Sequence, residues 1–218
     1  MNRQPAQAPR RPATTAGAGL RTGLRIGAGM RVGLYGGTFN PPHAGHLHVA
    51  DEARRRLGLD RVVFLVTQAN PLKDTRGLEG AEARRAALAH RIRRPWAVFS
   101  DIEGRIGSRY SIDTVRWLKA RYPGVRFVFV MGADSLAGLH RWKAWPELAR
   151  AVPIAIVSRP GYGLRGRLSP FARLFRHARL PARSARTLVD RSPPAWVYLP
   201  APFKDISSTA LRQAVLKM

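Results

Sequence analysis

Three glycines, a threonine and two histidines gather in one short stretch, GGTFNPPHAGH, at residues 36–46, directly after an apolar run. Glycines let a backbone approach an anion closely and present its N–H groups to it. Imidazoles at the entry to a helix can donate hydrogen bonds to phosphate oxygens, because a helix start carries partial positive charge. The candidate phosphate-binding residues are Gly36, Gly37, Thr38, His43 and His46.

Two other interpretations of this stretch stay open. A double glycine can form a tight turn that binds nothing. Histidines can also ligate a metal, but the chain has no cysteine and the stretch has no acidic residue near it before Asp51; a metal site needs further ligands of that kind. The stretch is neither a Walker A loop nor a GxGxxG fingerprint. We therefore favour phosphate and expect no metal held by side chains.

A second polar group lies near the carboxyl end, in DISSTALR at residues 205–212. Hydroxyls at a helix start usually cap the helix, and they equally offer hydrogen bonds to a phosphate. An arginine one turn further on can add a charged hydrogen bond. The candidates are Ser207, Ser208, Thr209 and Arg212.

Apolar runs and helical patterns alternate from Met30 onwards. The predicted strands cover residues 31–35, 61–66, 96–100, 125–132, 152–158 and 195–200. The predicted helices cover residues 45–58, 79–92, 111–122, 146–151 and 207–217. Continuous apolar strands separated by helices indicate a parallel sheet covered on both faces. The predicted fold class is α/β, a single Rossmann-like, doubly wound domain over residues 30–218, with ligands at the carboxyl ends of the strands.

Two segments depart from this pattern. Residues 1–29 carry no acidic or aromatic residue and are rich in Pro, Gly, Ala and Arg, so we expect a disordered basic tail. An organelle transit peptide is an alternative, although the segment lacks serine and is broken by Pro and Gly. Residues 159–194 are rich in arginine and also broken by Pro and Gly. We expect them to form a variable excursion from the fold, with one helix over 169–178.

The net charge of +25 over 218 residues has two interpretations. Clustered basic residues can mark a nucleic-acid partner. Here only five of the 38 basic residues are lysine and the arginines are scattered along the chain, which favours a compositional bias. No apolar run reaches the roughly 18 residues that a membrane-spanning helix needs. We expect a cytoplasmic protein without a membrane or nucleic-acid partner.

Several motifs resemble those of one enzyme superfamily. GGTFNPPHAGH and ISSTALR resemble the two signature motifs of the HxGH nucleotidyltransferases, in the same order and near opposite ends of the chain. NPLK, RYSIDTV and MGADSLAGLHRWKAW, at residues 70–73, 109–115 and 131–145, are similar to motifs of the bacterial nicotinate-nucleotide adenylyltransferases. The resemblance covers about residues 30–218. Asn40 departs from it, because many relatives have Asp there, and Ser111 stands where Thr is common.

The resemblance implies transfer of the adenylyl group of ATP to nicotinate mononucleotide in NAD biosynthesis, giving deamido-NAD and pyrophosphate. It also implies Mg²⁺ carried by the ATP phosphates. His43, His46 and Arg212 would be catalytic and supply positive charge. The ATP-binding residues would be Gly36, Gly37, Thr38, Gly132, Asp134, Ser207, Ser208 and Thr209. The residues that bind nicotinate mononucleotide would be Phe39, Lys73, Tyr110, Ser111 and Trp142.

Simpler roles and other functions remain as alternatives. Trp142 can be a core residue, Lys73 a solvated surface lysine and Asp134 a helix cap. A sister adenylyltransferase or cytidylyltransferase, such as one acting on phosphopantetheine, would share both phosphate motifs but lack HRWKAW and NPLK. A basic RNA-binding protein is disfavoured, because paired aromatic platforms for stacked bases are missing. Assembly into a homo-oligomer is left open.

Overall fold

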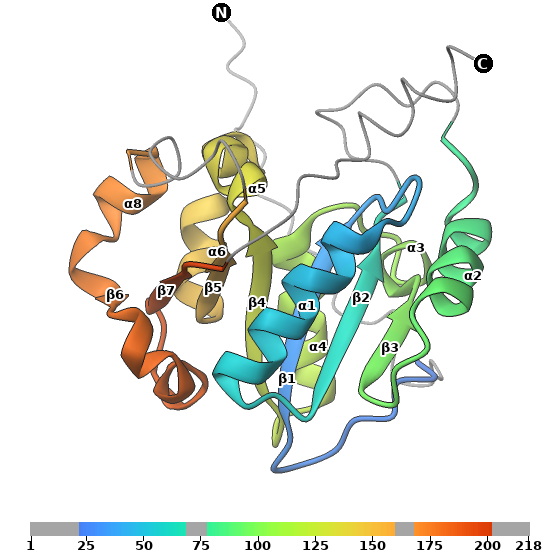
Figure 1. The fold of residues 1–218 in the computed structure, drawn as a ribbon, viewed down its shortest axis with the longest axis horizontal. Coiled ribbons are helices and arrows are strands. Elements are labelled where there is room, and N and C mark those ends of the chain that lie inside the picture. Colours follow the sequence, from blue (N-terminus) through green and yellow to red (C-terminus); the bar gives the residue numbers. More distant parts are fainter. Residues whose placement is uncertain (1–21, 69–77, 160–167, 202–218) are drawn as a thin grey trace, which may run out of the picture.

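A single parallel sheet organises the chain (Figure 1). The computed structural model describes residues 22–68, 78–159 and 168–201. Over these residues the strands follow the order β3-β2-β1-β4-β5-β7-β6, and every neighbouring pair is parallel. The strands are β1 (Arg31–Gly37), β2 (Arg61–Val66), β3 (Ala97–Ser100), β4 (Arg126–Gly132), β5 (Ile154–Val157), β6 (Arg179–Leu180) and β7 (Trp196–Leu199).

Helices connect the strands and cover both faces of the sheet. The α-helices are α1 (Ala44–Leu57), α2 (Ala81–Arg91), α3 (Ile102–Arg105), α4 (Ser111–Arg121), α5 (Ala133–Gly138), α6 (Trp145–Ala151) and α8 (Pro170–Leu174). Short 3₁₀ helices are η1 (Leu139–Arg141), η2 (Arg176–Ala178) and η3 (Ala182–Asp190). This arrangement confirms the predicted doubly wound α/β class. Among the described residues, no helix combines the length and apolarity that crossing a bilayer requires.

Two hydrophobic cores form because successive side chains of a strand point to opposite faces. In β1, Val32 and Leu34 belong to the core covered by α3, α4, α5, α6 and α8. Tyr35, next along the strand, belongs to the core covered by α1, α2 and η3. The central strands are therefore apolar at nearly every position, as the continuous hydrophobic runs in the sequence indicated.

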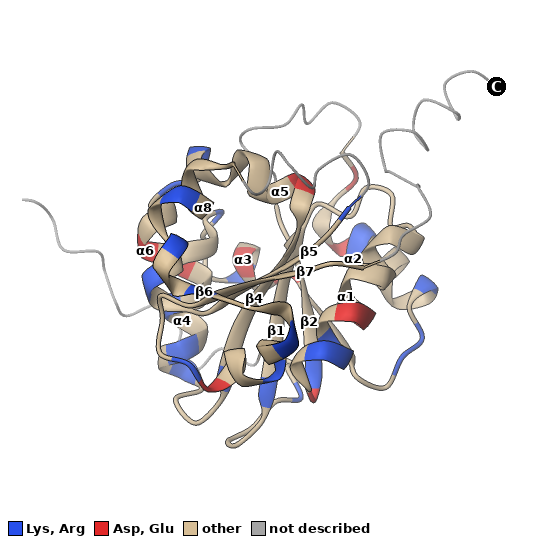
Figure 2. Cartoon of the chain, turned by 60° about the vertical axis from the view of Figure 1, so that its left-hand side comes forward, with Lys and Arg blue, Asp and Glu red and all other residues tan. Residues whose placement is uncertain are grey.

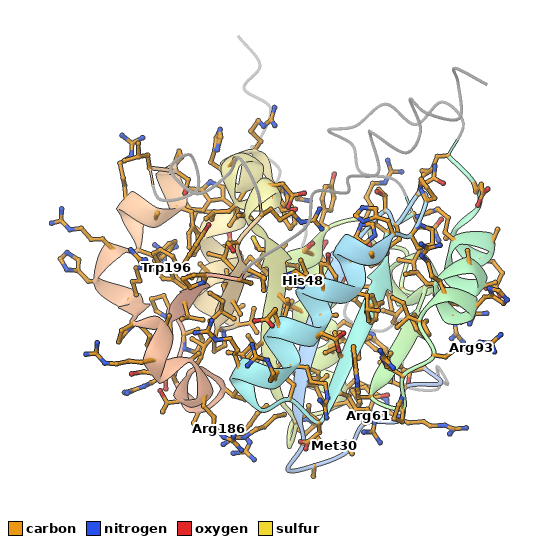
Figure 3. All side chains as sticks on the ribbon, in the orientation of Figure 1. Met30, His48, Arg61, Arg93, Arg186 and Trp196 are labelled. Atoms are coloured by element: carbon orange, nitrogen blue, oxygen red, sulfur yellow. The ribbon has the colours of Figure 1, made fainter. Side chains whose placement is uncertain are left out.

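The carboxyl ends of the strands all lie at the same edge of the sheet. In Figure 1 the arrowheads of β2 and β4 point to the top of the view, so the carboxyl ends of the strands lie there. Met30 and Arg61, which precede β1 and begin β2, lie at the opposite, lower edge in Figure 3. The loops that leave the upper edge are the ones that carry the candidate site.

The described ends of the predicted strands and helices agree with the structure within two residues, except that the helix predicted over 169–178 is divided into α8 and the 3₁₀ helix η2. The predicted helix at residues 207–217 lies outside the described residues. The short elements α3, α5, η1, β6 and η3 were not predicted. Of these, α3, α5, η1 and β6 are too short to show a period in the sequence.

The expectation that residues 159–194 leave the fold is wrong for residues 168–194. Phe171 of α8 and Leu188 of η3 are buried in the two cores. β6 pairs with β7, so this segment also supplies the last strand of the sheet. Its arginines lie between the apolar positions, and their number concealed the amphipathic pattern.

The amino-terminal boundary also differs from the expected one. Residues 1–21 lie outside the described residues, but residues 22–29 contact the domain. The Gly29 N–H donates to the Gly124 carbonyl at 2.8 Å, and Leu24 and Ile26 pack against the core that contains α4. The ordered fold therefore begins before Met30.

Candidate active site

Four neighbouring strands end side by side at the upper edge of the sheet. β1 and β2 are in register up to the pair Gly37 and Val66, and β4 and β5 up to the pair Gly132 and Val157. β1 and β4 are themselves neighbours. The loops after these strands therefore share one edge, which is where open α/β sheets bind their ligands.

His43 and His46 form a reciprocal cap at the start of α1. His43 is the N-cap residue, and its Nδ1 accepts a hydrogen bond from the Gly45 N–H at 3.0 Å. His46 Nδ1 accepts from the His43 backbone N–H at 3.2 Å. A neutral imidazole that accepts through Nδ1 carries its proton on Nε2. The cap therefore fixes both tautomers with Nε2 as the donor.

The charge state of His43 differs from our expectation. The side chain is 2 % exposed. Burial, with a smaller contribution from the Arg159 guanidinium, lowers the pKa of His43 to about 4. His43 is therefore neutral near pH 7 and acts as a hydrogen-bond donor, whereas the sequence led us to expect a positive charge.

Phe39 occupies a different position from the one expected for a ligand-binding ring. Its side chain is 1 % exposed and lies edge-on to His46, with 4.9 Å between the ring centroids. Its φ of 49° is in the left-handed region, which non-glycine residues rarely adopt. The ring packs against His46 and is buried, so any ligand contact of Phe39 has to go through its backbone.

A side chain would be crowded at two of the predicted glycine positions. A Cβ on Gly37 would lie 2.9 Å from the Phe39 ring, and a Cβ on Gly132 would lie 2.3 Å from Asp134 Oδ1. Both distances are too short for carbon in ordinary contact. The double-glycine loop is therefore closely packed against the aromatic residue that supports His46, in addition to being able to approach an anion.

An arginine that we had assigned to the excursion lies at this site. Arg159 follows β5, and its Nε is 3.3 Å from Oδ1 of Asp134. The Arg159 side chain also hydrogen-bonds Tyr35, whose pKa is raised to about 12, chiefly by burial. Asp134 thus pairs with a cation. The position of Arg159 directly after an apolar strand was the sequence signal that could have identified it.

The two segments around Tyr110 and Trp142, both predicted to bind nicotinate mononucleotide, lie against each other. Lys143, next to Trp142, places its Nζ 4.2 Å from the centroid of the Tyr110 ring. Trp142 is half-buried and packs edge-on to Phe129 of β4, with 6.2 Å between centroids. One edge of its indole is therefore used in packing, and the side chain is neither fully buried nor isolated.

The start of α4 offers backbone donors beside Tyr110. Tyr110 is the N-cap residue, and its side chain makes no capping hydrogen bond. Ser108 Oγ accepts from the Tyr110 N–H at 3.2 Å and donates to Asp113 Oδ2 at 3.1 Å. Ser111 is the first residue of the helix. The backbone N–H groups at the start of the helix, from Ser111 onwards, can donate to a carboxylate, which a helix start favours.

Part of the predicted site lies outside the described residues, namely Lys73, Ser207, Ser208, Thr209 and Arg212. Within residues 22–68, 78–159 and 168–201, no group of three or more His, Cys, Asp or Glu side chains is arranged to hold a metal ion. The donors described here are imidazole and amide N–H groups beside one guanidinium. This set suits phosphate oxygens better than a metal cation.

Over the part of the chain that the structure describes, the basic residues do not gather at one place. Figure 2 shows Lys and Arg on the helices at both sides of the sheet in that view. Several arginines bind the chain's own backbone or carboxylates; Arg126, for example, donates to the Gly29 carbonyl and to Asp190. This distribution agrees with a compositional bias better than with a nucleic-acid groove.

Comparison with solved structures supports the fold. The chain is similar to the Plasmodium falciparum nicotinic acid mononucleotide adenylyltransferase complexed with NaAD, with a TM-score of 0.63 and 15% identity, over 84% of this chain and 83% of that one. The same enzyme complexed with APC gives a TM-score of 0.62 over the same shares. At this identity the likeness concerns the fold alone.

Comparison of sequences identifies the family. The cytidylyltransferase-like family matches residues 34–214. A probable nicotinate-nucleotide adenylyltransferase of Caulobacter sp. (strain K31) is 52% identical over 82% of this chain and 95% of its own length. That of Cereibacter sphaeroides (strain ATCC 17025) is 50% identical over the same shares. By these matches the chain belongs to the cytidylyltransferase-like family and, within it, to the nicotinate-nucleotide adenylyltransferases.

Proposed function

We propose that this chain transfers the adenylyl group of ATP to nicotinate mononucleotide and releases pyrophosphate. An oxygen of the mononucleotide 5′-phosphate attacks the α-phosphorus of ATP, and the bond from that phosphorus to the oxygen bridging to the β-phosphate breaks. The attacking phosphate is already ionised, so the reaction needs no side-chain nucleophile. The protein has to align two anions that repel each other and stabilise the charge that moves to the leaving group.

The observation that carries the proposal is the reciprocal cap of His43 and His46. Because both Nδ1 atoms accept backbone N–H groups, both imidazoles present Nε2–H as the donor. They lie at the start of α1, beside the loop that follows β1. We assign them to the phosphate oxygens on which charge grows in the transition state, and we assign Arg159 to the same cluster of charges.

Recognition of the nicotinate end is assigned to the start of α4 and to Trp142. The N–H groups of the first turn of α4 receive the carboxylate, with the hydroxyl of Ser111 beside them. The indole of Trp142 stacks on the pyridine ring, and its contact with Phe129 fixes its orientation. The adjacency of Lys143 and Tyr110 supports this assignment, because it brings the two segments together.

ATP enters this proposal as its magnesium complex, the form in which phosphates and water supply most ligands of the ion. Asp134 is paired with Arg159, so the assignment gives no side chain the task of holding the ion alone. We place the reaction in the cytoplasm. Lys73, Ser207, Ser208, Thr209 and Arg212 keep the roles that the motifs imply, as part of the same proposal.

The test is pyrophosphate release from ATP with three acceptors: nicotinate mononucleotide, its amide analogue and phosphopantetheine. We expect the acid to be preferred, because donors arranged for a carboxylate are poorly paired by an amide. Reactions without ATP and reactions without an acceptor give the background rates. Equal kcat/KM for acid and amide would contradict the assignment of the start of α4 to the nicotinate carboxylate. Preference for phosphopantetheine would contradict nicotinate mononucleotide as the acceptor.

A further inference from the structure

A completely buried arginine lies beside Thr38, the first residue of the loop that follows β1. Arg84, on α2, has a relative exposure of 0 % and is among the largest fully buried side chains. Its guanidinium donates to four backbone carbonyls of the described residues: Nε to Glu79 at 2.8 Å, Nη1 to Thr38 at 2.6 Å, and Nη2 to Thr67 at 2.8 Å and Gln68 at 3.2 Å. Within the described residues no carboxylate hydrogen-bonds it. A buried cation is costly, so this arrangement needs a reason.

The carbonyls that Arg84 binds belong to two of the loops at the upper edge. Thr38 follows the double glycine at the end of β1, and Thr67 follows β2. The Thr67 N–H donates to the Gly37 carbonyl at 3.1 Å, which continues the pairing of the two strands. Arg84, which belongs to α2, therefore links the two loops through buried hydrogen bonds.

The hydrogen bond to Thr38 fixes the direction of the next amide. The Thr38–Phe39 peptide is trans, since the cis bonds lie elsewhere. In a planar trans peptide the C=O and the N–H point in opposite directions. With its carbonyl held by Arg84, this peptide turns the Phe39 N–H away from the buried cation. Among the described residues no acceptor bonds that N–H.

The conformation of Phe39 agrees with a constrained loop. Its φ of 49° is one that a non-glycine residue keeps only when its surroundings determine it. The ring is held between Tyr35, Phe64 and His46. Arg84 holds the preceding carbonyl on the buried side. The ring contacts and this hydrogen bond together constrain the peptide that carries the Phe39 N–H.

We propose that Arg84 is a positioning residue that directs the Phe39 N–H towards the bound phosphates and keeps the loops after β1 and β2 in register. The inference rests on the proposed function, because it takes phosphate as the ligand of this loop. A lysine at this position has no planar fork and cannot bind carbonyls of both loops in the same geometry.

The first experiment uses the unmodified protein and inorganic pyrophosphate as the probe. We expect the ¹⁵N–¹H resonance of Phe39 to shift on titration, together with the amides around His46. If those amides respond and Phe39 does not, the proposed direction of its N–H is wrong. This measurement does not depend on whether any variant folds.

The second experiment compares Arg84→Lys with Leu88→Ala. Leu88 lies one turn further along α2 and is equally buried, so its truncation weakens packing without touching the carbonyls. At a temperature where circular dichroism shows both variants folded, Arg84→Lys should bind pyrophosphate at least about tenfold more weakly, the scale of a hydrogen bond to a charged group. Leu88→Ala should bind as the unmodified protein does. Equal losses in both variants would show that Arg84 is only structural.

The two proposals fail in different ways. If the chain makes deamido-NAD but Phe39 does not respond to pyrophosphate, the role of Arg84 is overturned and the enzyme assignment stands. If the chain transfers no adenylyl group but the Phe39 amide responds and Arg84→Lys weakens that binding, the loop is confirmed as a phosphate site and the proposed reaction is overturned.

Discussion

The imidazole rings of His43 and His46 lie 3.8 Å apart between centroids, and the backbone N–H of the first donates to the ring of the second. The two side chains thus form one unit, in which each tautomer is fixed by an amide at the start of α1. Removing one ring affects a donor to the phosphates and also the end of the helix. Variants have to separate these two effects.

We expect His46→Ala to lower kcat by about 100-fold or more, the scale of losing one preorganised donor to a developing negative charge. The KM values should change much less, because this donor acts mainly on the transition state. Steady-state kinetics with ATP and nicotinate mononucleotide measure both values, and circular dichroism checks the fold. A kcat equal to that of the unmodified protein would rule out the phosphate role of His46.

Changing His43 to asparagine should alter how stability depends on pH. The pKa of His43 is about 4 in the folded protein against 6.5 as its ordinary value, so between these pH values the unfolded chain binds more protons. The free energy of unfolding therefore falls as the pH drops from 6.5 towards 4. Asparagine keeps an acceptor for the Gly45 N–H and does not titrate.

Urea denaturation at pH 7 and at pH 4.5 measures this difference. His43→Asn should lose less stability over the interval than the unmodified protein, and kcat should fall because the Nε2 donor is gone. The exposed His140, changed to asparagine in the same way, is the matched control. An identical loss of stability in all three proteins would show that His43 does not supply the pH dependence.

Trp142→Ala should act on binding of the acceptor. Stacking of an aromatic side chain on a base contributes about 1–3 kcal/mol, so the KM for nicotinate mononucleotide should rise by about 5- to 150-fold with a nearly constant kcat. Trp142→Phe keeps an aromatic face and should show a smaller rise. If Trp142→Ala leaves this KM unchanged, the indole serves only in packing against Phe129.

The buried carboxyl of Glu103 should make stability depend on pH with the opposite sign to that of His43. The carboxyl is 1 % exposed, and burial raises its pKa to about 7, while a hydrogen bond from Thr114 opposes the shift. Between pH 4.5 and 7 the folded state binds more protons, so stability is lost as the pH rises through this range. Glu103→Gln should therefore raise the melting temperature at pH 8 more than at pH 5. An equal shift at both pH values would contradict the buried-carboxyl explanation.

Arg159→Gln should raise the pKa of His43. The Arg159 guanidinium contributes to lowering that pKa, although burial is the larger cause, so the new value should stay below 6.5. The KM for ATP should also rise if Arg159 belongs to the phosphate site. NMR titration of the His43 ring protons measures the pKa directly. A His43 pKa that does not move would show that the two side chains are not coupled.

Sequence patterns determined the central part of the fold, because they are local. The apolar runs at β1, β2 and β4 and the amphipathic α1 and α4 have the lengths and periods of buried strands and surface helices. The position of His43 and His46 at a helix start followed from the same local order. These elements needed no knowledge of distant contacts.

Contacts between distant segments could not be predicted in the same way. Arg159 reaches the site because β5 lies beside β4, which brings it to Asp134. Arg84 resembles any other arginine of an Arg-rich helix, and only the packing of α2 shows that it is buried. Phe39 was assigned to the ligand by its motif, whereas the surrounding rings of Tyr35, Phe64 and His46 bury it.

The strands at the two ends of the sheet are short, since β3 has four residues and β6 has two. Long exposed edge strands act as templates on which further chains can pair and aggregate. β6 pairs with the inner strand β7 at two positions, and its Arg179 guanidinium lies 5.2 Å over the ring of Trp196. A short outer strand with a charged side chain is a poor template. The outer edge formed by the two residues of β6 is therefore short, and another chain could form few backbone hydrogen bonds with it.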